Sequence, residues 1–339
     1  MRILFLTPQL PYPPQKGTAL RNWGLIKGLA PRHDVDLLSF RAPGQDAELS
    51  QPLLESCQRV ETVAQPERSV WDRLEGMLIT RYPDMALRLR SGGYAQRLAD
   101  WLSRESFDVI QVEGLELAPY LDVIEAAAQN SLVVFDDHNC EYLLQRRVFF
   151  TDLRAPARWP GAAYSFVQWL RLVRYEARVC RRADRVLTVS EADGAALKSL
   201  VPGLEPSVVP NGIDTTEYHR QAVDARPEEN SLVFTGTMDF RPNVDAVLWF
   251  VDEVLPLIRT EIPDVHFTIV GQRPHARLEP LKGRPDVTLT GWVEDVRPYI
   301  ASAEVYVVPL RMGGGTRLKL LEAMAMGKAV VATRLGAEG

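Results

Sequence analysis

Short apolar segments alternate with helical patterns along nearly the whole chain, and this alternation constrains the fold more than any other feature. The first apolar segment, residues 2–7, is followed by a loop containing Gly17 and by helical spacing over 18–30. A short, continuous apolar run indicates a strand that is buried on both faces of a parallel sheet. The alternation therefore predicts α/β structure with right-handed crossovers between parallel strands.

The segments form two series, separated by the turn Pro210-Asn211-Gly212. In the first series, strands are expected at residues 2–7, 35–40, 60–63, 108–112, 132–135 and 185–189, and helices include 94–103 and 164–182. In the second, strands are expected at 232–235, 266–270, 287–289, 305–308 and 329–332, and helices at 243–260, 296–302 and 316–326. We therefore expect two doubly wound, Rossmann-like domains, 1–210 and 211–339, that face a cleft where ligands bind.

Composition and charge exclude several classes of function. The 39 basic and 44 acidic residues give a net charge of −5, which provides no basic field for nucleic acid. The three cysteines form no CxxC pair, so neither a disulfide framework nor a structural zinc site is expected. No stretch reaches the roughly 18 apolar residues of a spanning helix. We expect a cytoplasmic protein that is at most peripheral on the inner face of a membrane.

Residues 309–328, PLRMGGGTRLKLLEAMAMGK, are the most informative segment for function. Three glycines follow an apolar strand and precede a helix whose first turn is expected to contain Thr316, Arg317 and Lys319. Free N–H groups at a helix start, the helix dipole and two cations all favour a phosphate or diphosphate. Glu322, about one turn further on, is placed to accept hydrogen bonds from ribose hydroxyls. Taken alone, the segment is also compatible with a tight connection that binds nothing.

The order of strand, glycine-rich turn and LLEAMAMGKAVVAT resembles the donor-binding signature of glycosyltransferase family 4. Further segments agree with this family in order and spacing: ADRVLTVS (183–190), VPNGID (209–214), FTGT (234–237), FTIVG (267–271) and LTGWV (289–293). The resemblance implies a GT-B fold and a retaining transfer of a sugar from a nucleoside diphosphate. The residues around Gly17 resemble the opening of exopolysaccharide-associated sugar transferases.

The resemblance also implies roles for individual residues. Glu322 would hold the nucleotide ribose, and Gly271 and Val293 would line the base pocket. The full donor-binding set is Gly17, Gly271, Val293, Gly314, Gly315, Thr316 and Glu322.

The chain departs from the family pattern at three positions. Gly314 stands where the family usually has the first Glu of a Glu-x7-Glu pair, and Thr237 and Pro242 replace an Arg and a Lys. The cations left to meet a diphosphate are Arg241, Arg317 and Lys319.

His138 directly follows an apolar strand, and the resemblance implies that it faces the transferred sugar or the acceptor. An imidazole can donate a hydrogen bond to a hydroxyl or exchange a proton near neutral pH. Asp137 and Glu141 are both candidates to orient His138 or to act on an acceptor hydroxyl. A purely structural role for His138 stays open.

Ten arginines lie between Arg146 and Arg185, interleaved with aromatic residues. This mixture suits a membrane interface with anionic lipids. It also suits a crossover helix with a solvated arginine face and an apolar core stripe, and we favour this second interpretation. The expected core stripe is Phe166, Leu170, Val173 and Ala177.

These observations predict a retaining, metal-independent glycosyltransferase that uses a nucleotide sugar and a glycan or lipid-linked acceptor in exopolysaccharide or cell-envelope synthesis. No cofactor and no metal are expected. Two alternatives stay open: an inactive nucleotide- or glycan-binding module, which Gly314 favours, and an epimerase of nucleotide sugars. The chain ends at residues 333–339, shortly after a strand, which predicts that the second domain is incomplete and that the chain is a fragment.

Overall fold

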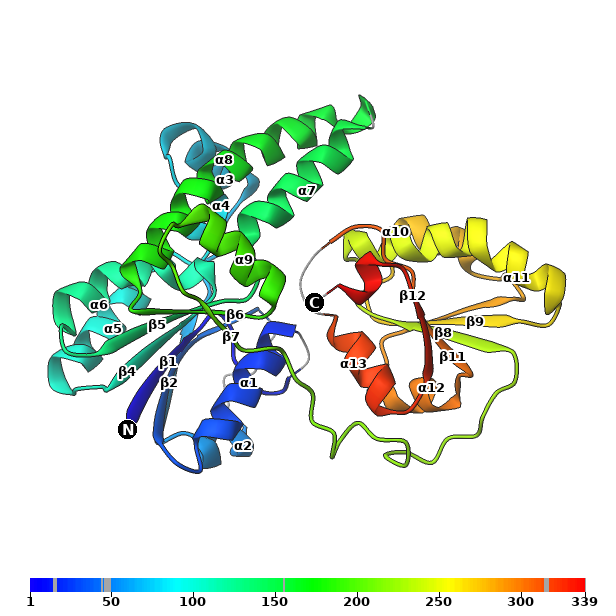
Figure 1. Ribbon diagram of the computed structural model, residues 1–339, viewed down its shortest axis with the longest axis horizontal. Helices are drawn as coiled ribbons and strands as arrows, with labels where there is room; N and C mark the ends of the chain where they lie inside the picture. Colours follow the sequence, from blue (N-terminus) through cyan, green and yellow to red (C-terminus); the bar gives the residue numbers. More distant parts are fainter. Residues whose placement is uncertain (15–16, 44, 46–49, 155, 314–316, 339) are drawn as a thin grey trace. The chain divides into compact units, whose positions relative to one another are not determined.

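The computed structural model describes residues 1–14, 17–43, 45, 50–154, 156–313 and 317–338. The chain divides into two compact units, Met1–Asn211 and Gly212–Gly339, so the boundary lies one residue after the expected position. Each unit is a parallel sheet covered by helices (Figure 1). They are called unit 1 and unit 2 below.

Unit 1 contains a seven-stranded parallel sheet in the order β3-β2-β1-β4-β5-β6-β7. The six predicted strands are present, with ends shifted by one or two residues, and the two-residue strand β7 was not predicted. The order reverses between β1 and β4, where connections leave toward opposite ends of the sheet. The strands are β1 (Arg2–Thr7), β2 (Asp34–Arg41), β3 (Arg59–Ala64), β4 (Val109–Glu113), β5 (Leu132–Asp137), β6 (Arg185–Thr188) and β7 (Ser207–Val208).

Apolar side chains extend from both faces of the unit 1 sheet. In β1, Ile3 and Phe5 join one buried cluster, and Leu4 and Leu6 join another on the opposite face. This explains the continuous apolar run in the sequence, because successive strand residues point to opposite faces. The helices are α1 (Gly17–Leu29), α2 (Gln51–Ser56), α3 (Val70–Ile79), α4 (Asp84–Arg88), α5 (Gly92–Arg104), η1 (Leu115–Tyr120), α6 (Leu121–Ala127), α7 (Glu141–Leu153), η2 (Pro156–Arg158), α8 (Trp159–Arg182) and α9 (Glu191–Leu200).

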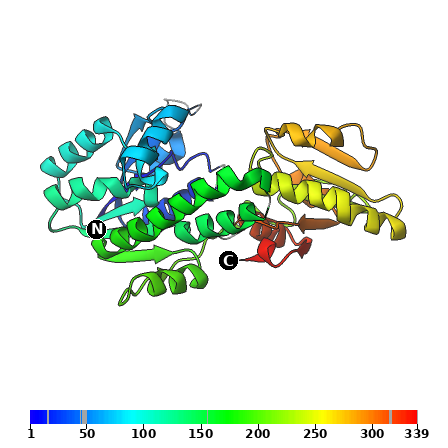
Figure 2. The same ribbon diagram turned by 90° about the horizontal axis from the view of Figure 1, so that it is seen from above.

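Helices α7 and α8 lie side by side and form the α7–α8 hairpin, which extends from the sheet layer of unit 1 (Figures 1 and 2). The predicted core stripe of α8 is partly wrong. Ala177 is buried and Val173 is half-buried, but Phe166 and Leu170 are exposed. The inward face is Ala162, Ser165, Gln168, Leu172, Tyr175, Glu176, Ala177, Val179 and Cys180.

Unit 2 contains a five-stranded parallel sheet in the order β10-β9-β8-β11-β12, and the order reverses between β8 and β11. All five predicted strands are present. They are β8 (Ser231–Thr235), β9 (His266–Val270), β10 (Val287–Gly291), β11 (Val305–Val308) and β12 (Ala329–Ala332). The helices are α10 (Arg241–Trp249), the π-helical turn η3 (Phe250–Val254), α11 (Leu255–Glu261), η4 (Ala276–Leu281), α12 (Arg297–Ser302), α13 (Leu318–Ala325) and η5 (Leu335–Ala337).

Two predicted helices of unit 2 differ from the structure. The helix expected over 243–260 begins at Arg241 and is interrupted by η3, which precedes Pro256. Proline has no N–H for the helical ladder, and the π turn accommodates this loss. The helix expected over 316–326 begins at Leu318, so that Arg317 is its N-cap residue.

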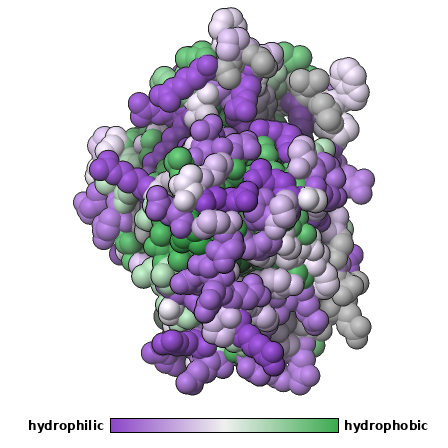
Figure 3. Space-filling model, turned by 90° about the vertical axis from the view of Figure 1, so that its right-hand side faces the viewer, coloured by the Kyte–Doolittle hydropathy of each residue, from purple (hydrophilic) through white to green (hydrophobic). Residues whose placement is uncertain are grey.

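The face drawn in Figure 3 is mainly hydrophilic, with apolar residues in smaller areas between the polar ones. None of the helices in the described part of the chain has the length and apolar character to cross a membrane.

The carboxyl ends of β8 and β9 approach each other closely at two glycines. Gly236 follows β8 and donates its backbone N–H to Val270 O in β9 (2.9 Å). A Cβ on Gly271 would lie 1.7 Å from Gly236 O, which no side chain can accommodate without a backbone shift. Gly271 is therefore required for this strand-end packing.

We predict that Gly271→Ala lowers the free energy of unfolding of unit 2 by about 3 kcal/mol, because the added methyl group forces the two backbone segments apart. Gly212→Ala is the matched control, since nothing lies within 4 Å of its Cβ position. Denaturant unfolding of both variants checks this. Equal midpoints for the two variants would contradict the predicted close contact.

Candidate functional site

Unit 1 has a pocket of about 50 Å³ at the point where its strand order reverses. The loops after β1, β4 and β5 and the start of α1 contribute to it. Ligands of open α/β sheets bind at such positions, outside the carboxyl ends of the strands. The lining residues are Pro8, Thr18, Gly114, Leu115, Glu116, Asp137, His138, Asn139 and Glu141.

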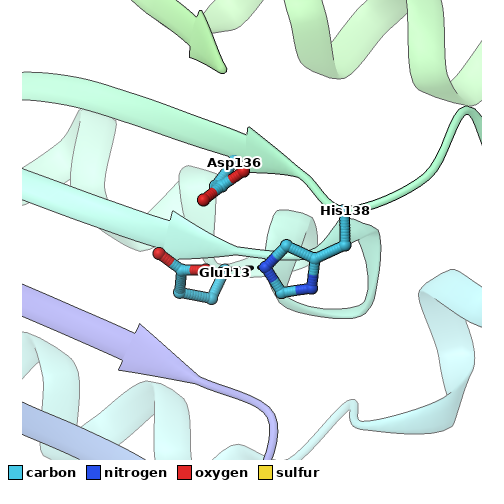
Figure 4. A group of neighbouring side chains, drawn as sticks. All are labelled: Glu113, Asp136 and His138. Carbon is cyan, nitrogen blue, oxygen red and sulfur yellow. Dashed lines mark hydrogen bonds and ion pairs between the residues drawn. The ribbon is translucent and has the colours of Figure 1, made fainter. Parts of the chain in front are cut away.

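His138 and Glu113 form a hydrogen-bonded pair beside this pocket (Figure 4). Glu113 is the last residue of β4, and His138 is the first residue after β5. The register pairs Glu113 with Asp136, which places His138 two residues further along and within reach. His138 Nε2 lies 2.6 Å from Glu113 Oε2, and the Glu113 side chain is fully buried.

The residue that orients His138 is therefore Glu113, whereas the sequence favoured Asp137 or Glu141. Gln111 Nε2 donates to Glu113 Oε1 (2.8 Å), so the carboxylate is itself fixed. The sequence feature that could have indicated Glu113 is the Glu113-Gly114 pair directly after an apolar run. Sequence alone offers no means to choose it over the acidic residues next to His138.

A buried ion pair joins Arg21 to Asp136, next to Glu113 and His138. Arg21 of α1 donates to both carboxylate oxygens of Asp136, from Nε (2.8 Å) and Nη2 (2.9 Å). Its Nη1 donates to Val209 O (2.8 Å) and Asn211 Oδ1 (3.0 Å). Arg21 thus joins α1, β5 and the end of unit 1. A buried pair of this kind is tolerated because its hydrogen-bonding groups are satisfied.

Neighbouring charges alter the pKa values around His138. Burial alone lowers the pKa of His138, but the hydrogen bond and charge of Glu113 and the charge of Asp136 outweigh it, so the pKa is raised. Burial raises the pKa of Glu141 to about 8, with smaller contributions from Glu116 and Glu176. The imidazole and Glu141 can therefore both hold a proton near neutral pH.

Two groups of side chains have the residue types of metal ligands. Glu113, Asp136 and His138 place suitable atoms within 4.8 Å of one another, as do Asp137, Cys140 and Glu176. In the first group, the acidic charge is already met by Arg21 and the imidazole. In the second, Glu176 accepts the backbone N–H groups of Glu141 and Tyr142 at the start of α7 (2.8 and 2.9 Å).

In unit 2, Lys319 reaches the carboxyl end of β8, where the strand order reverses. Its Nζ donates to Thr235 O (2.7 Å) and Asn243 Oδ1 (3.1 Å) and lies 4.3 Å from the centre of the Phe234 ring. Burial lowers the pKa of Lys319 to about 7. An ammonium group has three N–H donors. Contacts with the described residues use two of these donors, and we expect the third to be available to a ligand.

The structure brings several of the predicted site residues of unit 2 close to Lys319. A Cβ on Gly236 would lie 2.8 Å from Lys319 Nζ, and Gly236 is in turn in contact with Gly271. Glu322 lies one turn along α13, and burial raises its pKa although Lys319 opposes this. Arg241 begins α10, in the same turn as Asn243.

The remaining predicted residues have less direct placements. Arg317 lies against Gly313 and donates from Nε to Leu335 O (3.4 Å). Val293 is half-buried and packs against the core of unit 2, and Gly17 is the exposed first residue of α1. Gly314, Gly315 and Thr316 lie outside the described residues.

Sequence reasoning missed Gly236 and Asn243 as site residues. Gly236 leaves space for the Lys319 ammonium group, because a side chain there would also meet Asn243 Nδ2 at 2.7 Å. Asn243 donates from Nδ2 to Thr237 O (2.9 Å) and accepts from Lys319, so it links α10 to α13. The FTGT segment contained the signal for Gly236, but nothing in the sequence marked Asn243.

Comparison with known proteins gives consistent results. The family model described as "Glycosyltransferase Family 4" matches residues 16–217, and the one described as "Glycosyl transferases group 1" matches residues 229–339. A Klebsiella pneumoniae protein described as an uncharacterized 44.6 kDa protein in the cps region is 23% identical over an aligned length of 353 residues, which covers 100% of this chain and 84% of the relative.

Mannosyltransferases are also similar to this chain. The phosphatidyl-myo-inositol mannosyltransferase of Mycolicibacterium smegmatis is 33% identical over 264 residues, which cover 76% of this chain and 61% of that enzyme. In the Mycobacterium tuberculosis (strain CDC 1551 / Oshkosh) enzyme of the same name, 34% identity extends over 40% of this chain and 36% of the enzyme.

Solved structures show the same fold at low identity. Anabaena HepE in complex with UDP and glucose has a TM-score of 0.60 and 16% identity, over 100% of this chain and 82% of HepE. TarM has a TM-score of 0.68 and 12% identity, over 100% of this chain and 86% of TarM. Two parallel α/β sheets, the GT-B likeness and the two family models lead to one conclusion: the chain belongs to glycosyltransferase family 4.

Proposed function

We propose that this glycosyltransferase transfers a sugar from a nucleoside-diphosphate sugar, with retention of configuration and without a metal ion, to a glycan or lipid-linked acceptor. The pathway we propose is exopolysaccharide or cell-envelope synthesis, and the location is the cytoplasm or the inner face of the membrane. The nucleotide sugar is the only small molecule required, as a co-substrate rather than a cofactor.

The observation that carries this proposal is the position of Lys319. An ammonium group with two hydrogen bonds to the described residues lies at the strand-order reversal of unit 2, and Gly236, which has no side chain, leaves room for it there. A diphosphate fits such a group because its charge grows as the bond to the sugar breaks, and a preorganised cation then lowers the barrier. Arg317 and Arg241 add charge within the same unit.

The relatives supply a context that agrees with the proposal. HepE was solved with UDP and glucose, the mycobacterial relatives are named for transfer of mannose to a phosphatidylinositol, and the Klebsiella relative is encoded in a cps region. For this chain, a uridine diphosphate donor and a lipid-linked or polysaccharide acceptor are therefore the first combinations to test.

We predict that Lys319→Met and Arg317→Ala each weaken binding of UDP by about tenfold or more, because each removes a charged hydrogen-bond donor from the diphosphate. Calorimetry with UDP and a panel of other nucleoside diphosphates measures this. Arg277→Ala, which removes an exposed arginine elsewhere in unit 2, is the control. If both variants bind within twofold of the wild type, these donor-site roles are wrong.

We predict that UDP affinity falls as the pH rises above about 7, by up to about tenfold per pH unit. The diphosphate binds the ammonium form of Lys319, and the pKa of about 7 means that this form is lost above neutral pH in the free protein. Lys319→Arg keeps its charge throughout this range, so its affinity should not show this slope. Identical pH profiles for the two proteins would exclude Lys319 as the titrating group.

Product analysis tests the chemistry and the alternatives. Retention predicts that proton NMR shows the same anomeric configuration in donor and product, and activity should survive EDTA. UDP binding without turnover on any nucleotide sugar would favour the inactive binding module. Conversion of a nucleotide sugar without an acceptor would favour an epimerase.

We further propose that the α7–α8 hairpin contacts an anionic lipid surface. Trp159, Phe166 and Leu170 are 57%, 41% and 40% exposed, and their spacing of seven and four residues places them on one face of α8. Arg174 and Arg178 are exposed further along the same face. Apolar side chains next to arginines match the acyl boundary and the anionic headgroups of a bilayer surface.

Co-sedimentation with phosphatidylglycerol-containing vesicles tests this contact. We expect salt-sensitive binding to these vesicles. Phe166→Ser or Trp159→Ser should weaken it by about tenfold, because each removes a large apolar side chain that the lipid surface would bury. Leu257→Ser, at an even more exposed apolar position in unit 2, is the control and should bind as the wild type does. No binding of the wild type to these vesicles would refute the membrane contact.

A further inference from the structure

The hydrogen bond between Glu113 and His138 occupies one imidazole nitrogen and so determines which nitrogen can contact a ligand. His138 Nε2 is engaged with Glu113 Oε2 at 2.6 Å, so the proton shared with the carboxylate is on this side of the ring. The Asn22 amide, in the orientation that satisfies both of its polar atoms, also donates to Oε2 (2.8 Å). Together with the hydrogen bond from Gln111 to Oε1, these contacts engage both oxygens of the Glu113 carboxylate.

The opposite edge of the ring lies beside Gly114, which lines the pocket together with His138. A Cβ on Gly114 would lie 3.7 Å from His138 Nδ1 and 3.9 Å from Cε1, and Gly114 has a φ of +86°, which favours glycine. Among the described residues, none makes a hydrogen bond to Nδ1. Nδ1 is therefore the nitrogen available to the pocket.

The pocket next to Nδ1 is rich in hydrogen-bond acceptors. Glu116, Asp137 and Glu141 line it, and no lysine or arginine is among its described lining residues. Asp137 is 1% exposed, and its Oδ2 has no hydrogen-bond partner among the residues described. Such a pocket suits a ligand that donates hydrogen bonds.

We propose that Glu113 is a positioning residue, which holds His138 through Nε2 so that Nδ1 contacts a hydroxyl of a sugar unit in this pocket. The identity of the ligand as a sugar rests on the proposed function. With a neutral imidazole, Nδ1 accepts a hydrogen bond from the hydroxyl, and with a protonated imidazole it donates one.

The charge of His138 depends on groups from several elements. Glu113 faces it from β4 and Asp136 from β5, whereas Arg21 of α1 opposes its protonation. Glu116 after β4 and Glu141 of α7 complete the surroundings of the pocket. Removal of the Glu113 charge therefore removes the main group that favours the imidazolium form, while Arg21 remains.

NMR of the wild-type protein labelled with 15N-histidine tests the orientation directly, and the chain has only five histidines to assign. We expect His138 to carry its proton on Nε2 when neutral. In Glu113→Gln, an amide faces Nε2, so we expect the Nδ1–H tautomer and a titration midpoint shifted to lower pH. A neutral His138 with its proton on Nδ1 in the wild type would overturn the proposal.

Activity provides a second readout. Glu113→Gln should lower kcat/KM about tenfold or more and move the acidic limb of the pH profile to lower pH, while UDP binding in unit 2 is unchanged. Glu125→Gln, which removes an exposed carboxylate paired with Arg182, is the control. Unchanged activity and an unchanged pH profile in a folded Glu113→Gln variant would show that Glu113 has no positioning role.

If the wild type transferred no sugar at all, the proposed function would fail, but the NMR result would still decide the orientation of His138.

Discussion

Parallel strand pairing with one reversal of strand order is the constraint on which both sites depend. In unit 1 the strand order reverses between β1 and β4, and in unit 2 it reverses between β8 and β11. The loops that follow the two strands at each reversal lead in opposite directions, so they separate at the carboxyl ends of these strands. Side chains that follow these strands then have room for a ligand. The pocket of unit 1 and the Lys319 ammonium group of unit 2 both lie at such a reversal.

The two sites stabilise their buried charges in different ways. In unit 1, opposite charges balance one another, with Arg21 on Asp136 and His138 on Glu113. In unit 2, Lys319 is held by a backbone carbonyl, an amide oxygen and an aromatic ring, and burial lowers its pKa to about 7. The first arrangement is satisfied without a ligand, whereas the second gains from an anion that restores the full charge.

Sequence reasoning was least reliable where the partner of an element was unknown. The inward face of α8 depends on α7, which the sequence did not predict as a helix, and Phe166 and Leu170 therefore appeared to be core residues. In the structure, Ala162, Ser165 and Gln168 face inward in the first half of α8, whereas Phe166 and Leu170 are exposed. The side-chain pattern of one helix cannot show which face its neighbour covers.

The sequence by itself determined the two series of parallel strands, the family, and the position of His138 and Lys319 at strand ends or helix starts, because strand periodicity and glycine placement are local properties. Only the tertiary structure decided which partners those side chains have. Glu113 meets His138 because β4 and β5 pair in one register, and Lys319 meets Asn243 because α10 and α13 converge on β8. Such contacts join residues 25 and 76 positions apart, and their geometry is set by sheet pairing and packing.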